Sequence, residues 1–293
     1  MDFIKNNLSQ RATETKKEKT YYFLFFRSFS IVFFVFFILF FSGCQVPEEG
    51  CTDVAASNFD ITALKTCATN CCVYPQLKIR TQFLWGSDAV FFDLNTPYKI
   101  GLDSVKFLSA QLYISAISFT PLAGGKNVSV SDSIALYRAN DTIMRPNNYA
   151  LIGKNYGFNY TLGSFTGFGS YNYAHFTVGL DSVSNMVIPS KMPASSPFAV
   201  KADSAYDNKN STFIFQKFIF VKGANYKDTV QINIENAQTI DAGCRLTFIR
   251  GFDAVMPFKI DYKKLFLDVN VQSDPNTIAQ KIVSNYTNSF SVQ

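Results

Sequence analysis

The sequence predicts an all-β protein, folded as an antiparallel β-sandwich of immunoglobulin-like architecture with a short C-terminal helix. Three observations support this fold class. Aromatic residues make up 16% of the chain, with 31 Phe and 15 Tyr, and aromatic side chains are enriched in strands. Short runs of alternating apolar and polar residues recur between turn-forming segments. The strand–helix–strand rhythm of a parallel sheet does not occur in the sequence.

The first 43 residues have the pattern of an export signal. Ile31–Phe41 is an unbroken run of eleven apolar residues that follows a basic stretch ending at Arg27. The run is short for a membrane-spanning helix, so a signal peptide over residues 1–43 is favoured, with an uncleaved anchor helix as the alternative. The ending Phe41-Ser42-Gly43-Cys44 resembles a bacterial lipobox. The resemblance implies cleavage before Cys44 and attachment of a lipid to it. We therefore expect a membrane-anchored outer-membrane lipoprotein of a Gram-negative bacterium, on the periplasmic or cell-surface side.

Residues 44–76 are expected to form a polar tether and a small cysteine-rich module. Four cysteines crowd into this segment: Cys51, Cys67, Cys71 and Cys72. They form no Cys-x-x-Cys pair and no His lies nearby, so disulfides are favoured over a zinc site in an exported chain.

Two sequence motifs of this module indicate how its cysteines pair. Gly50-Cys51-Thr52-Asp53 and Cys72-Val73-Tyr74-Pro75 resemble a short module found at the start of many bacterial surface lipoproteins. The resemblance implies a disulfide between Cys51 and Cys72, and Cys67 is then expected to pair with Cys71. Cys244 is left odd, either as a buried free thiol or as a metal ligand or cross-link.

Residues 77–293 are expected to form the sandwich domain. Leu77–Leu84 alternates apolar and polar residues, as a half-buried strand does. Further strand-like runs follow in order: Val90–Leu94, Val105–Phe119, Val128–Tyr137, Tyr173–Gly179, Thr212–Val221, Thr229–Ile234, Cys244–Ile249 and Phe258–Asp261. Tyr156–Tyr173, rich in Gly and aromatic residues, is expected to be an exposed loop or an edge hairpin. A helix is predicted to begin near Asp274, which can cap it, with Pro275 in its first turn.

Five short sequence segments occur in order along the predicted sandwich domain. They are Leu108–Ser115, Phe176–Ser182 followed by Asn185, Phe215–Gly223, Phe258–Phe266 and Ile278–Phe290. Together they resemble segments of the MbnP family, the copper-binding partners of methanobactin gene clusters and their relatives. The resemblance implies an exported β-sandwich. It also implies copper, bound by histidines near a Trp that a di-haem peroxidase-like partner oxidises to kynurenine.

The chain departs from the family pattern at the ligands. Its only His is His175 and its only Trp is Trp85, which lies outside the segment where the family carries its Trp. A two-histidine copper site within one chain is therefore excluded. His175 could still hold copper if sulfur completed a soft Cu(I) site, and Met186 is the partner predicted first. The other sulfur candidates are Met192, Met256 and Cys244. The alternative is a strand His that packs or faces solvent.

Asp181 and Asn185 lie in a polar, turn-forming segment after a predicted strand. A carboxylate and an amide oxygen could coordinate a hard cation. The same side chains could instead brace the loop through hydrogen bonds to the backbone, which is the commoner outcome.

Several function classes are disfavoured. Of the net charge of +5, residues 1–43 carry +3, so the remainder lacks the basic patch of a nucleic-acid-binding protein. No G-x-S-x-G elbow, P-loop or dinucleotide fingerprint occurs, and we predict that the protein is not an enzyme. The predicted function is binding, namely copper handling through a site that has lost most of the family's ligands. The alternative is a metal-free cell-surface module that binds a glycan or a partner protein through Tyr156–Tyr173.

Overall fold

The computed structural model describes residues 48–200 and 205–293. The predicted signal peptide and the lipidation site at Cys44 lie outside the described residues. The described chain divides into a small unit, residues 48–49 and 62–65, and a large unit, residues 50–61, 66–200 and 205–293. In the small unit, Lys65 forms an ion pair of 3.1 Å with Glu49. Among the described residues, no helix is long and apolar enough to cross a membrane.

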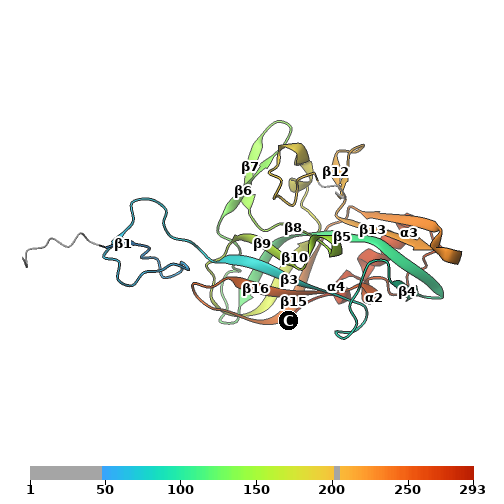
Figure 1. The fold of residues 1–293 in the computed structure, drawn as a ribbon, viewed down its shortest axis with the longest axis horizontal. Helices are drawn as coiled ribbons and strands as arrows, with labels where there is room; N and C mark the ends of the chain where they lie inside the picture. Colours follow the sequence, from blue (N-terminus) through green and yellow to red (C-terminus); the bar gives the residue numbers. More distant parts are fainter. Residues whose placement is uncertain (1–47, 201–204) are drawn as a thin grey trace, which may run out of the picture. The chain divides into compact units, whose positions relative to one another are not determined.

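Two packed sheets form the large unit, which confirms the predicted all-β sandwich (Figure 1). The seven-stranded sheet has the order β14-β13-β5-β10-β15, and two short strands, β4 and β8, also pair with β5. Its strands are β4 Pro97–Ile100, β5 Asp103–Pro121, β8 Ala150–Gly153, β10 Gly169–Val178, β13 Gln216–Lys222, β14 Asp228–Ile234 and β15 Gln238–Phe248. The four-stranded sheet has the order β17-β16-β3-β9. Its strands are β3 Gln76–Leu84, β9 Asn159–Ser164, β16 Ala254–Asp261 and β17 Phe290–Val292.

The main core lies between these sheets, because strand residues alternate between the two faces. In β15 every second residue from Ile240 to Phe248 is buried, while Thr239 and Asp241 point outward. Phe119 is fully buried and meets Phe248 edge to face, with ring centroids 5.2 Å apart. The excess of Phe and Tyr in the sequence is used in such ring contacts, each of which adds about 0.5–1.5 kcal/mol beyond burial.

A second apolar cluster covers part of the outer face of the seven-stranded sheet. Tyr113 of β5 points outward into it, and its ring meets the Phe213 ring edge to face at 5.6 Å. The covering layer stands above the large sheet in Figure 1. It consists of β6 Ser133–Tyr137, β7 Thr142–Pro146, the 3-10 turns η2 Ser184–Met186 and η3 Pro189–Lys191, and the two-residue strands β11 Tyr206–Asp207 and β12 Thr212–Phe213. The outer face of β10 and β15 carries exposed side chains instead, and this difference positions the candidate site.

The observed strands differ from the prediction in several places. Val90–Leu94 forms only one bridge, between Leu84 and Phe91. Val128–Tyr137 is a strand only in its second half, and Thr212–Val221 is broken at Ile214–Phe215. β3 and β16 pair in parallel, whereas the other strand pairs of the two sheets are antiparallel.

The prediction for Tyr156–Tyr173 was wrong. The segment contains β9 and the start of β10, which belong to different sheets, so it is neither a loop nor a hairpin. Leu162 and Phe165 are buried in the main core. The segment is therefore a crossover between the sheets, and deleting it would remove part of the core.

The predicted C-terminal helix is present as α3 Pro275–Ser284. The carboxylate of Asp274 accepts hydrogen bonds from the backbone N–H groups of Asn276 and Thr277, as an N-cap does. The remaining helical elements are short: η1 Lys154–Tyr156, η4 Ala224–Tyr226, α2 Tyr262–Leu265 and α4 Tyr286–Ser289.

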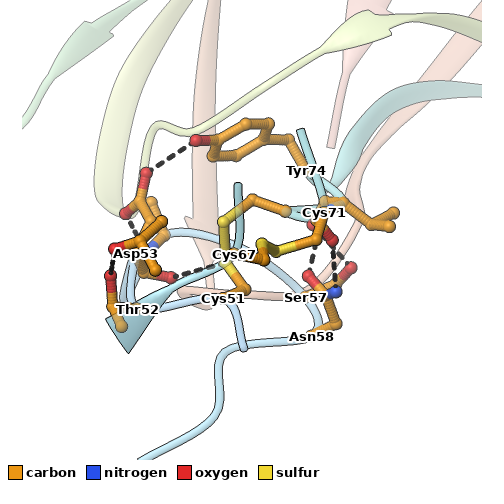
Figure 2. The surroundings of a disulfide bond; sticks show 12 residues. Cys51, Thr52, Asp53, Ser57, Asn58, Cys67, Cys71 and Tyr74 are labelled. Carbon is orange, nitrogen blue, oxygen red and sulfur yellow. Dashed lines mark hydrogen bonds between the residues drawn. A yellow bond between two sulfur atoms is a disulfide. The ribbon is translucent and has the colours of Figure 1, made fainter. Parts of the chain in front are cut away.

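The cysteine-rich module contains both predicted disulfides, Cys51–Cys72 and Cys67–Cys71 (Figure 2). Polar contacts support them where a core would otherwise be needed. The Tyr74 hydroxyl donates to the Asp53 carboxylate at 2.8 Å, and the Asn58 amide donates to the Cys71 carbonyl at 2.7 Å. The two short strands of this region are β1 Glu49–Gly50 and β2 Lys65–Thr66.

Candidate functional site on the outer sheet face

His175 lies on β10, on the outer face of the sheet, between β5 and β15. Its Nδ1 is 2.6 Å from Asp241 Oδ1 on β15, and its Nε2 is 2.7 Å from Thr120 Oγ1 on β5. Thr120 Oγ1 also donates to Asn127 Oδ1 at 2.8 Å. The side chain of His175 is 24% exposed and that of Asp241 is 68% exposed. Both ring nitrogens are thus engaged by neighbouring strands.

The predicted sulfur ligands do not gather around His175. Cys244 is on β15 but faces the core, on the opposite face of the sheet from His175, and it is a free buried thiol. Burial raises the pKa of this thiol. Met256 is buried in the main core and Met192 in the second cluster. Met186, on η2, is 53% exposed and belongs to the layer over the other part of the sheet.

Cys244, Met256 and Met192 therefore point into the two apolar cores, away from the exposed face that carries His175. Within residues 48–200 and 205–293, no group of three or more His, Cys, Asp or Glu side chains could hold a metal. Trp85 does not adjoin His175 either, because it packs against the core between the sheets, with its ring centroid 4.1 Å from that of Tyr98.

Asp181 and Asn185 brace the chain where it leaves β10. Asp181 Oδ1 accepts from the N–H groups of Val183 and Ser184 at 2.9 and 2.8 Å. Asn185 Oδ1 accepts from Phe213 N–H at 2.8 Å. Burial, the largest single influence, raises the pKa of the Asp181 carboxyl, but the hydrogen bonds from Ser184 and Val183 together hold it below its usual value. The two side chains hydrogen-bond to separate backbone groups, as expected for residues that brace the loop.

Thr120, His175 and Asp241 are connected in the order of a nucleophile–base–acid triad. The backbone N–H groups next to Thr120 are not free to stabilise an oxyanion, as acyl transfer would need. The next residue, Pro121, has no N–H, and the N–H groups of Phe119 and Leu122 donate to Val128 and Ser170. The connected side chains therefore bind and orient one another without an oxyanion hole formed by the flanking backbone.

A depression of about 550 Å³ lies beside His175. Its lining comes from β10, β15 and the C-terminal end: Asn172, Tyr173, Gly243, Cys244, Arg245, Val292 and Gln293. A β-bulge shapes it, because the pairing steps from Tyr171–Leu246 to Tyr173–Gly243 and leaves an extra residue on β15. Sequence reasoning missed this site. The signal was a glycine in an alternating strand, opposite an outward-facing tyrosine.

The order of the five sequence segments points to one family. The family MbnP matches residues 74–283 of the chain. The chain belongs to the MbnP family. Among solved structures, MbnP from Methylosinus trichosporium is similar, with 15% identity, a TM-score of 0.43 and coverage of 67% of this chain and 78% of that chain. No curated protein matches the sequence. Membership confirms the resemblance drawn from the five segments and places this MbnP-family chain among binding domains.

Proposed function

We propose that this MbnP-family chain is an exported, membrane-anchored binding protein that presents the outer face of β10 and β15 to its ligand. The observation that carries the proposal is the contrast within one sheet. The second apolar cluster covers Tyr113 and its neighbours, whereas Tyr173, on the uncovered face, is 47% exposed beside a depression. Exposed aromatic and polar side chains around a concave surface are typical of ligand sites.

Features of the chain before the sandwich support export and anchoring. Two disulfides within residues 51–72 suit an oxidising compartment. The apolar run Ile31–Phe41 and the lipobox-like ending at Cys44 supply the anchor, on the periplasmic or cell-surface side of the outer membrane.

Anchoring is tested by expressing the full chain and its Cys44→Ser variant in a Gram-negative host with a labelled fatty acid. We expect label in the wild type, recovered with outer membranes, and no label in the variant. A Cys244→Ser variant is the matched control and should remain labelled. Equal labelling of wild type and Cys44→Ser would contradict the lipoprotein assignment.

Copper binding through His175 is the second candidate function. Asp241 accepts from Nδ1 and fixes the ring, and the Thr120 hydroxyl lies 2.7 Å from Nε2. A carboxylate behind a metal-ligating histidine is a common supporting arrangement. The nearby donors are nitrogen and oxygen atoms, which fit Cu(II) rather than Cu(I). If this site operates with a partner, the family resemblance implies a di-haem peroxidase-like protein.

The copper candidate is tested by Cu(II) titration of the full chain in detergent, with bound metal measured by mass spectrometry. We expect one equivalent in the wild type, lost in His175→Ala and kept in Met186→Leu. Loss in Met186→Leu, or retention in His175→Ala, would refute binding at this histidine.

A further inference from the structure

We propose that the depression around Gly243 binds a pyranose ring of a glycan. The inference rests on the proposed binding function and names the ligand class of its surface. The volume of about 550 Å³ falls within the roughly 300–1,000 Å³ of small-ligand sites. The site lies at the bulge between the Tyr171–Leu246 and Tyr173–Gly243 pairs, next to the His175–Asp241 pair.

Gly243 forms the open floor of the depression. Apart from Gly243 itself and its two chain neighbours, no heavy atom lies within 4 Å of the position that a Cβ would occupy at this residue. Its φ lies outside the left-handed region, so the backbone does not require glycine here. Neighbouring β15 residues on the same face, Asp241 and Arg245, carry large side chains. What Gly243 provides is space on a face where any side chain would fill the depression.

Tyr173 forms an aromatic wall beside this space. It is the cross-strand partner of Gly243 and 47% exposed. Its ring does not lie over the glycine, because the space above Gly243 is empty within 4 Å. A sugar ring has an apolar C–H face of matching size, and a tyrosine ring presents a flat apolar surface with a polar hydroxyl at its tip. Stacking a pyranose on Tyr173 places it above Gly243.

The polar rim matches hydroxyl groups. Asn172 Oδ1 is buried and accepts no hydrogen bond among the described residues. Asn172 and Gln293 contribute amide groups to the lining, and a sugar hydroxyl, which is both donor and acceptor, can pair with such groups. Arg245 and Gln293 add donors to the lining. The nearest carboxylate, Asp241, is held by His175.

The same features disfavour two other ligand classes. A polyanion such as a nucleic acid requires several cations, and Arg245 is the single cationic side chain of the lining. A peptide strand added along the free edge of β15 would gain backbone hydrogen bonds there. It would not reach Asn172 and Tyr173, which lie one strand inward on β10.

The test uses the full chain, purified in detergent, on an array of neutral and uronic-acid-containing oligosaccharides, followed by calorimetric titration of the strongest ligand. We expect Tyr173→Ala and Gly243→Val each to weaken binding about tenfold or more, because stacking or space is lost. Tyr137→Ala, an exposed tyrosine on β6, and Thr239→Val, on the same face of β15, are the matched controls and should bind as wild type. Binding that persists at high salt assigns a neutral sugar, and binding lost at high salt together with Arg245→Gln assigns an acidic one.

Several outcomes overturn the proposal. One is a blank array for a folded wild type. Another is binding that neither Tyr173→Ala nor Gly243→Val weakens, or that Tyr137→Ala weakens equally. Thermal unfolding of each variant checks that it is folded. Tyr173→Ala makes a side chain of the depression smaller and Gly243→Val makes one larger, so a shared loss of binding would not come from one kind of volume change. If the array is blank but lipid labelling depends on Cys44, the sugar proposal fails and the proposal of a membrane-anchored binding protein remains. If Cys44→Ser is labelled like the wild type, the anchoring proposal fails, whatever the array shows.

Discussion

Replacing Cys51 and Cys72 together by serine should unfold the cysteine-rich module and leave the sandwich folded. The disulfide joins residues 21 apart in sequence, and closing a loop of this length stabilises by about 3 kcal/mol in the chain-entropy treatment. Little else can replace it, because Cys51 and Ala56 are the only buried hydrophobic residues between residues 50 and 72. The remaining hydrogen bonds, such as Asn58 to the Cys71 carbonyl, contribute about 0.5–1.5 kcal/mol each. Ordering one residue costs about 1–2 kcal/mol.

Limited proteolysis with mass spectrometry is the assay. We expect rapid cleavage within residues 50–75 of the double variant and an unchanged thermal midpoint for the sandwich. The matched control is Cys67→Ser with Cys71→Ser, which opens a loop of separation 4 and should cost only about 2 kcal/mol. A protease-resistant module in the first variant, or a lowered sandwich midpoint, would refute the reasoning that this disulfide replaces a core.

Three further predictions concern the sandwich. Phe119→Ala should lower the free energy of unfolding by about 3–5 kcal/mol, measured in urea, because the ring is fully buried; Phe252→Ala, 68% exposed, is the control, and equal losses would contradict the packing. Asp181→Ala should cost about 1–3 kcal/mol at neutral pH. The pKa of Asp181 is lowered below 3.8 on folding, so its contribution is fully present above that value and is lost as pH falls through the lowered pKa; a wild-type advantage that persists in strong acid would exclude the assignment. Cys244, a core-facing thiol of raised pKa at the base of the depression, should react with a thiol reagent much faster after unfolding than in the native protein, and equal rates would contradict this placement.

Local patterns predicted the parts of the fold that local forces decide. The alternation in β3 and the cap at Asp274 are visible in the sequence and recur in the structure. β4, β7 and β8 were missed because strands of four or five residues carry too few alternating positions and gain their stability from a neighbouring strand. The parallel pairing of β3 with β16 joins segments far apart in the chain, so no local pattern encodes it.

The candidate site depends on register, which a single sequence does not display. His175 meets Asp241, 66 residues away, and Thr120, 55 residues away. Tyr173 faces Gly243 only because a bulge shifts the pairing of β10 with β15. Residue types also suggested Cys244 as a sulfur ligand of His175, yet strand alternation places Cys244 on the opposite face of the sheet. The Cys51–Cys72 disulfide, by contrast, followed from the resemblance of the module to other lipoproteins and is present.

The central claim is that the uncovered face of β10 and β15 is the binding surface. Hydrogen–deuterium exchange of the full chain, with and without the oligosaccharide selected by the array, tests it directly. We predict slower exchange on binding in peptides that cover residues 169–178 and 238–248, and no change over residues 133–146. Protection confined to the covering layer, residues 133–146 and 184–200, would contradict the claim.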